Sequence, residues 1–192
     1  MTTSIPIEEQ KQIRNRTAKP LLWVALAGMT MIFASLTSAY VVRQADPDWL
    51  SFDLPSVFFI STGIIILSSF TLVFADWSAK NNNQIGIKLG LGLTLLLSIA
   101  FVYSQFYAYG VMISEGMYFS GTNISSSFLY ALTFVHLAHV FGGNITLLVT
   151  FIQSLRNKYS SSNKLGIELA SWYWHYLTGV WMFLLLFLLY IN

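Results

Sequence analysis

All three histidines of the sequence lie inside its last two long apolar segments, with His136 and His139 in one segment and His175 in the other. Imidazole binds metals and haem and carries protons near neutral pH, so it is the side chain here best suited to chemistry. In hydrocarbon it is costly unless it finds partners, so intramembrane histidines first indicate a functional site. His136 and His139 are spaced i, i+3 and share one helical face. Together with His175 they could form a metal or haem site if the three side chains met.

The depths of the three histidines in a membrane argue against such a site. If both segments are helices that cross the bilayer in opposite directions, His139 lies about 13 residues, or ~20 Å, above the cytoplasmic end of its helix. His175 lies about six residues, or ~9 Å, above the same side. The two depths differ by ~10 Å, whereas each ligand of a metal ion lies only ~2 Å from it. We therefore expect no metal and no cofactor on this chain and neutral imidazoles hydrogen-bonded within the bundle or to a partner subunit, and we keep a metal or haem site as the alternative.

Other catalytic groups are missing from the apolar segments. The sequence has no cysteine, no paired intramembrane carboxylates, no Ser/His/Asp set and no phosphate-binding loop. Asp76 and Glu168 stand only at the edges of apolar segments, whereas a proton path needs acidic or histidine relays across the bilayer. We expect no catalytic residues, because the chain alone resembles neither an enzyme nor a pump.

Five long apolar segments must position these histidines. The sequence is 55% hydrophobic and 9% charged, whereas a soluble domain is about a quarter charged. Each segment has close to the ~20 residues that a helix needs to cross the hydrocarbon. The sequence thus predicts an all-α integral membrane bundle of five transmembrane helices within residues 21–192, after a polar cytoplasmic tail at residues 1–20. The approximate spans are 21–42, 57–75, 86–109, 128–153 and 168–191.

The basic residues predict the orientation of the bundle. Of the ten Lys and Arg residues, all except Arg43 precede the first span, fall between spans two and three or spans four and five, or lie at the very start of the third span. Basic residues gather on the cytoplasmic side, so we expect a cytoplasmic N-terminus and a C-terminus outside. The net charge of +2 gives no reason to expect a nucleic-acid partner.

Two local patterns predict how helices pack and begin. Small residues recur four apart, for example at Ala34/Ser38 and Gly86/Gly90, and such spacing lets membrane helices approach closely. The sequence Asp53-Leu-Pro55 predicts the start of the second helix, with Asp53 as its N-cap.

The histidine segments, read with the rest of the chain, resemble subunit III of the haem–copper terminal oxidases, most closely the short five-helix form of bacterial cytochrome c oxidase subunit III. The family's His-x-x-His-Val element is matched by His136, His139 and Val140. Its last helix carries Tyr-Trp-His-Phe-Val-Asp-x-Val-Trp, and Tyr173–Trp181 is similar to it. The other residues that carry the resemblance are Tyr40, Arg43, Leu67-Ser-Ser69, Gln105, Gly142, Gly143, Trp174, His175 and Trp181.

The chain departs from the family pattern at three acidic positions. The family's buried carboxylate in the first span falls near Met29, the acid that follows Gln-x-x falls at Ala108, and the aspartate of the last motif falls at Thr178. All three changes remove acid from the membrane. We therefore expect any accessory role in proton handling to be weaker here, with the packing role unchanged.

The resemblance implies a non-catalytic accessory subunit. Such a subunit packs against the catalytic subunit I and other oxidase subunits, which carry the haem and copper, and helps to keep the oxidase active during turnover. It also binds membrane phospholipids, and a larger respiratory supercomplex is a further expected partner. The reaction, reduction of O2 to water coupled to proton translocation, belongs to the whole complex.

Several alternatives stay open on the sequence alone. The chain could accompany a nitric-oxide reductase or a quinol oxidase, because the electron donor is chosen by another subunit. A small channel or transporter would need polar residues along one face through the bilayer, and Ser, Thr and Tyr are scattered here without such a stripe.

Overall fold

The computed structural model describes residues 7–47, 49, 54–119, 124–161 and 163–191 of the chain. They form five helices, each long and apolar enough to cross a membrane, which confirms the predicted all-α architecture and its five spans. The helices are α1 (Ile7–Arg43), α2 (Val57–Lys80), α3 (Gln84–Ser114), α4 (Ile124–Leu155) and α5 (Leu165–Ile191).

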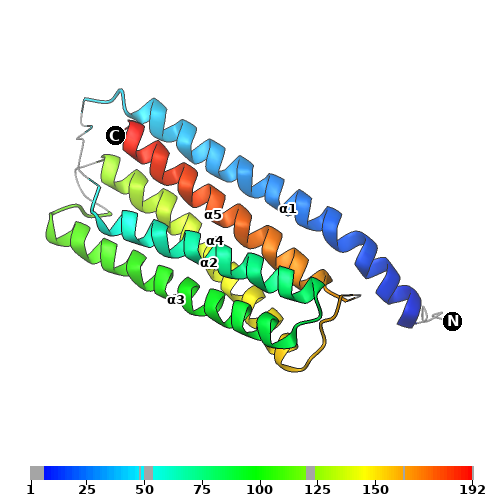
Figure 1. Ribbon diagram of the computed structural model, residues 1–192. Coiled ribbons are helices and arrows are strands. Elements are labelled where there is room, and N and C mark those ends of the chain that lie inside the picture. The colour runs from blue at the N-terminus through cyan, green and yellow to red at the C-terminus, as the bar shows by residue number, and fades with distance from the viewer. Residues whose placement is uncertain (1–6, 48, 50–53, 120–123, 162, 192) are drawn as a thin grey trace.

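The helices run alternately up and down, so that α1, α3 and α5 start at one end of the bundle and α2 and α4 start at the other (Figure 1). Helix α5 packs against α1, α2 and α4, whereas within the described residues α1 contacts only α4 and α5. α1 therefore lies along one side of the bundle, and α2–α5 form its body.

The helix boundaries differ from the predicted spans mainly in α1. This helix begins at Ile7 and continues through Pro20, so residues 7–20 of the predicted polar tail are helical. The reason is that Glu, Gln, Lys and Arg, which dominate this segment, are strong helix formers even though they are not apolar. A hydropathy pattern marks the membrane-crossing part of a helix, and the helix itself can extend further.

The N-cap predicted for α2, Asp53, is wrong. The N-cap of α2 is Ser56 and makes no side-chain capping bond, while Asp53 lies outside the described residues. α3 does have a side-chain cap, because the Asn83 side chain accepts a hydrogen bond of 3.1 Å from the backbone N–H of Gly86.

Helices α2 and α3 form the most extensive helix pair of the bundle, and Gly90 allows their backbones to approach closely. A Cβ added to Gly90 would lie 2.7 Å from the Cβ of Ala75 and 2.9 Å from its backbone. The predicted role of Gly86 and Gly90 in close packing is therefore observed at this contact. Ala34 and Ser38 instead line a groove, described below.

The connection between α4 and α5 is held to the bundle by polar contacts. The buried Tyr159 donates its hydroxyl to Oε1 of Gln153 at 3.0 Å, and the carbonyl of Tyr159 accepts from Nε2 of Gln84 at 2.7 Å. Burial raises the pKa of the Tyr159 hydroxyl, which keeps it protonated and able to donate.

Candidate functional site

Four polar residues of the segment Tyr173–Trp181 contact helix α2. Nε1 of Trp174 donates to Oγ of Ser68 at 2.9 Å, and Nε1 of Trp181 donates to Oγ1 of Thr62 at 2.9 Å. Both indoles are buried, and tryptophan at such sites normally needs an acceptor for its N–H. These two bonds join α5 to α2 across about two helical turns.

His175 joins the same contact between α5 and α2. Its Nδ1 lies 3.0 Å from Oγ of Ser69, and that hydroxyl lies 3.0 Å from Oγ1 of Thr178. At Thr178, where the resemblance implies an aspartate in the family, a hydroxyl thus lies one turn from the histidine. Ser68 and Ser69 on α2 are thus the hydrogen-bond partners of Trp174 and His175 on α5.

His136 lies in a different environment, among aromatic rings. Its ring centroid is 5.1 Å from that of Trp181, 6.1 Å from Phe101 and 6.2 Å from Phe33. It is fully buried, and neither of its ring nitrogens has a hydrogen-bond partner in the part of the chain that the structure describes. Of the two kinds of hydrogen bond that we expected for the histidines, the one inside the bundle is therefore not observed for His136.

His139 is half-buried and is bonded within its own helix. Its Nδ1 lies 2.7 Å from the carbonyl of Val135, and since a carbonyl only accepts, Nδ1 carries the proton. The backbone carbonyl of His139 accepts a bond of 3.1 Å from the Tyr173 hydroxyl, which links α4 to α5.

The structure does not bring the three histidines together. Trp181 is in ring contact with His136, and His175 lies six residues earlier on the same helix, which is about 9 Å along its axis. No group of three or more His, Asp or Glu residues that could hold a metal occurs among the described residues. The three histidine side chains thus lie in separate contacts.

The remaining motif residues fall at other levels of the bundle. Tyr40 is fully buried with its ring against Trp49, Phe128 and Phe187, and Arg43 forms a 2.7 Å ion pair with Asp46.

Gln105 is 1% exposed, and neither of its amide atoms has a hydrogen-bond partner within the described ranges. Of the positions that lack the family's acids, Ala108 is fully buried and Met29 is half-buried.

Several polar contacts between helices were not anticipated from the sequence. Oγ1 of Thr71 lies 2.8 Å from that of Thr94, the Tyr109 hydroxyl donates to Thr133 at 3.0 Å, and Ser98 donates to Asn144. Single Ser and Thr residues in apolar helices usually bond to their own backbone, so their type and spacing alone do not reveal a partner on another helix.

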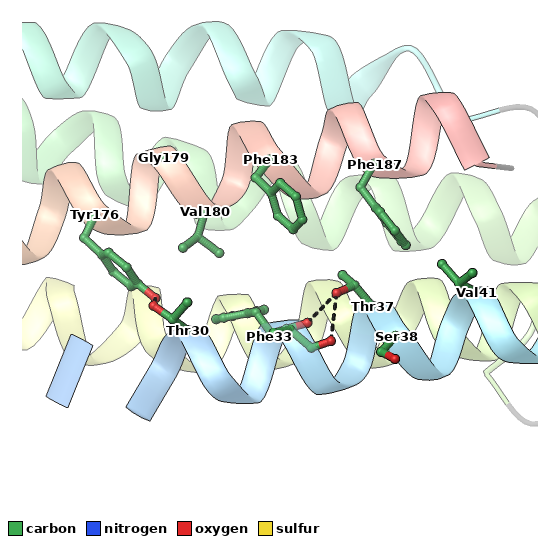
Figure 2. A pocket seen from close by; sticks show the side chains of 11 residues that line it. Thr30, Phe33, Thr37, Ser38, Val41, Tyr176, Gly179, Val180, Phe183 and Phe187 are labelled. Carbon is green, nitrogen blue, oxygen red and sulfur yellow. Dashed lines mark hydrogen bonds between the residues drawn. The ribbon is translucent and has the colours of Figure 1, made fainter. Parts of the chain in front are cut away.

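An apolar groove of about 630 Å³ runs between α1 and α5 (Figure 2). Its lining extends from Thr30 to Val41 on α1, which is about 16 Å along the helix. The hydroxyls of Thr30 and Tyr176, 2.8 Å apart, close it near mid-helix, and Gln44 bonds to the carbonyl of Ile191 beyond its other end. No pattern in the sequence predicts this groove, because it arises where two helices far apart in the chain separate from each other.

Residues 50–192 match the family model of cytochrome c oxidase subunit III. The chain belongs to the cytochrome c oxidase subunit III family. The family's matched region includes α2–α5 and hence all three histidines and the contacts between α2 and α5.

Relatives that carry this family's name are found in bacteria and insects. The chain is 33% identical over 160 residues to a probable cytochrome c oxidase subunit 3 of Rickettsia felis, a match that includes 79% of this chain and 55% of the relative. It is 30% identical over 167 residues to the cytochrome c oxidase subunit 3 of Bacillus sp. (strain PS3), with 84% of this chain and 80% of the relative included. The chain thus spans about half the length of the rickettsial relatives and most of the Bacillus one.

Proposed function

We propose that this chain is a non-catalytic accessory subunit, subunit III, of a respiratory haem–copper oxidase that reduces O2 to water with proton translocation. The observation that carries the proposal is the family match over residues 50–192, which includes every polar residue of the bundle's α2–α5 contact. In this proposal the haem and copper are held by partner subunits, with subunit I as the principal neighbour and cytochrome c as the electron donor.

The internal contacts support a scaffold role. The hydrogen bonds of Trp174, Trp181 and His175 to α2 join two helices of the same chain. Large apolar side chains on the outer faces of α2, α3 and α4 remain exposed in the isolated chain, as expected for a surface that meets lipid or partner helices.

We further propose a bacterial inner-membrane location with the N-terminus in the cytoplasm. Lys80 at the end of α2, Lys88 in the first turns of α3 and Lys164 just before α5 lie at the same end of the bundle as the start of α1, while Arg43 lies at the other. Lys19 and Lys164 both pair with Glu168 there, at 2.7 and 3.2 Å. This distribution supports the orientation through the positive-inside rule.

Phospholipid binding is also part of the proposal, with one acyl chain in the groove between α1 and α5. The groove's length of about 16 Å is close to half of a hydrocarbon core of ~30 Å. An acyl chain ends at the bilayer midplane, where Thr30 and Tyr176 close the groove, whereas a transmembrane helix of a partner would have to continue past them. The groove's shape therefore suits one leaflet's lipid better than a helix.

The test of the main proposal is purification from the native host in mild detergent through a tag on the C-terminus. We expect haem absorption and cyanide-sensitive O2 uptake to co-purify with the tagged chain. Removal of the chain should leave the haem content unchanged and shorten the active lifetime of the oxidase. Recovery of the chain alone and colourless would overturn the assignment, and co-purified nitric-oxide consumption without O2 uptake would replace the oxidase by a nitric-oxide reductase.

The lipid part is tested by mass spectrometry of lipids that co-purify with the chain. A Gly179→Phe substitution should fill the groove and remove one bound phospholipid per chain, because nothing lies within 4 Å of a Cβ at this lining position. Gly28→Phe is the matched control, since Gly28 is equally open but does not line the groove. Equal lipid content in both variants and the unsubstituted chain would contradict lipid binding at this site.

A further inference from the structure

Gln105 and His136 are the polar side chains in the middle of the bundle whose hydrogen-bonding needs are unmet. They are 1% and 0% exposed, and all four of their polar side-chain atoms are without a partner among the described residues. The other unpartnered buried atoms belong to Trp49, Asp76, Ser78 and Gln84, which lie in a connection or in the first or last turns of helices. Bulk water is close to those positions, whereas Gln105 lies nine residues, or about 14 Å, from the end of α3.

The two side chains lie on facing helices at the same level. α3 and α4 are antiparallel, and the Tyr109 hydroxyl donates to Thr133 at 3.0 Å. Four residues back from Tyr109 is Gln105 and three residues on from Thr133 is His136, so their levels agree within about one residue's rise, or ~1.5 Å. Phe101, one turn below Gln105, is in ring contact with His136, which supports this register.

No hydrogen bond joins the two residues directly. A buried amide or imidazole left unsatisfied is destabilising, and the large majority of buried polar side-chain atoms in proteins have a partner. Where two facing polar groups do not bond directly, the usual bridge is an internal water. Neutral imidazole offers one N–H donor and one acceptor nitrogen, and the amide offers two N–H donors and an oxygen.

We propose that Gln105 and His136 form a binding site for an internal water molecule between α3 and α4. The water accepts a bond from one residue and donates to the other, and so meets the two to four polar partners that a buried water requires. The site lies between the Ser98–Asn144 bond and the Tyr109–Thr133 bond. It completes a line of three polar links that hold α3 against α4. This inference concerns the internal structure of the chain and stands whether or not the chain is an oxidase subunit.

The test uses the full chain labelled with 15N only at histidine and reconstituted in lipid nanodiscs. The sequence has three histidines, so His139→Gln and His175→Gln variants assign the ring signals of His136 by elimination. In the unsubstituted chain we expect a ring N–H of His136 with a cross-peak to water. That cross-peak should disappear and the ring nitrogen signals should shift in Gln105→Leu.

A matched control is Gln84→Leu, which removes a glutamine at the first position of α3 and should leave the His136 signals unchanged. A His136 ring N–H without contact to water in the unsubstituted chain would overturn the proposal. Unchanged His136 signals in Gln105→Leu would overturn it as well. The first of these readouts needs no substitution at the site, so it does not depend on a variant that folds.

Discussion

At the residue scale, the indole nitrogens of Trp174 and Trp181 are buried donors whose acceptors are hydroxyls on the neighbouring helix α2. In lipid there is no competing water for these groups, and an unmade bond leaves the N–H unsatisfied. Ser68 is therefore more than a small packing residue, because it provides the acceptor for a fully buried tryptophan.

We expect Ser68→Ala to lower the free energy of unfolding by about 1–3 kcal/mol, because Nε1 of Trp174 would lose its acceptor. The measurement is SDS-induced unfolding in mixed micelles, followed by tryptophan fluorescence. Ser35→Ala is the control: Ser35 is exposed and bonds to the carbonyl of Ile32 in its own helix, so its removal should change stability by less than about 0.5 kcal/mol. Equal effects of the two substitutions would contradict the role given to Ser68.

The proposed water site predicts coupling between Gln105 and His136. Gln105→Leu and His136→Phe should each destabilise the chain by about 1–3 kcal/mol, because each leaves the other residue unsatisfied. The double variant should cost less than the sum, since no polar group then remains to be satisfied, and a double-mutant cycle measures the difference. Additive effects within about 0.5 kcal/mol would show that the two residues do not share a bridge.

At the element scale, the pair α2 and α3 is held by close backbone approach, whereas α1 contacts α5 at separate points and leaves a groove along part of it. Gly90 lets α3 lie against the backbone of Ala75. α1 contacts α5 through the ring pair Trp23–Trp172, with centroids 4.9 Å apart, and through the Thr30–Tyr176 bond, and beyond these the groove separates the two helices. Helix spacing in this bundle thus follows the size of the residues at each contact.

We expect Gly90→Ala to destabilise the bundle by about 1–3 kcal/mol, because the new methyl group would force α2 and α3 apart. Gly28→Ala should be neutral or stabilising by up to about 1 kcal/mol, since nothing lies within 4 Å of a Cβ there and Ala favours the helix. The same unfolding assay compares the two. If Gly90→Ala were as well tolerated as Gly28→Ala, the close contact would not limit the helix spacing.

At the scale of the whole molecule, the five alternating helices place the connections between them at the two ends of the bundle, and these connections can report the orientation of the chain in the membrane. The turn between α2 and α3 and the connection between α4 and α5 lie at one end, with the start of α1 (Figure 1). Asn81 is exposed in that turn, and Glu115 is exposed at the opposite end, after α3. The two residues therefore report the two sides of the membrane.

The orientation is tested with single cysteines, because the sequence has none of its own. In intact cells we expect a membrane-impermeant maleimide to label Glu115→Cys but not Asn81→Cys. Permeabilised cells should label both, which controls for accessibility. Labelling of Asn81→Cys in intact cells would reverse the proposed orientation.

The family motifs singled out certain residues, but did not predict which residues these would contact. The motif around Trp174 and His175 and the Leu67-Ser-Ser69 signature were recognisable separately, and the structure joins them by hydrogen bonds. A hydrogen bond for His136 was expected, and the structure instead surrounds this side chain with aromatic rings. The groove between α1 and α5 had no sequence signal, since its lining residues are ordinary for a membrane helix.

Composition and charge alone determined that this chain is a five-helix membrane bundle, since the lack of water in the hydrocarbon leaves helices of about 20 apolar residues as the solution. The separate depths of His175 and His136 also follow from the sequence, because helical rise is constant along a helix. Only the tertiary structure decided which polar residues face each other and where α1 stands away from α5. Those features depend on helix rotation and spacing, which are set by many small packing contacts between segments far apart in the chain.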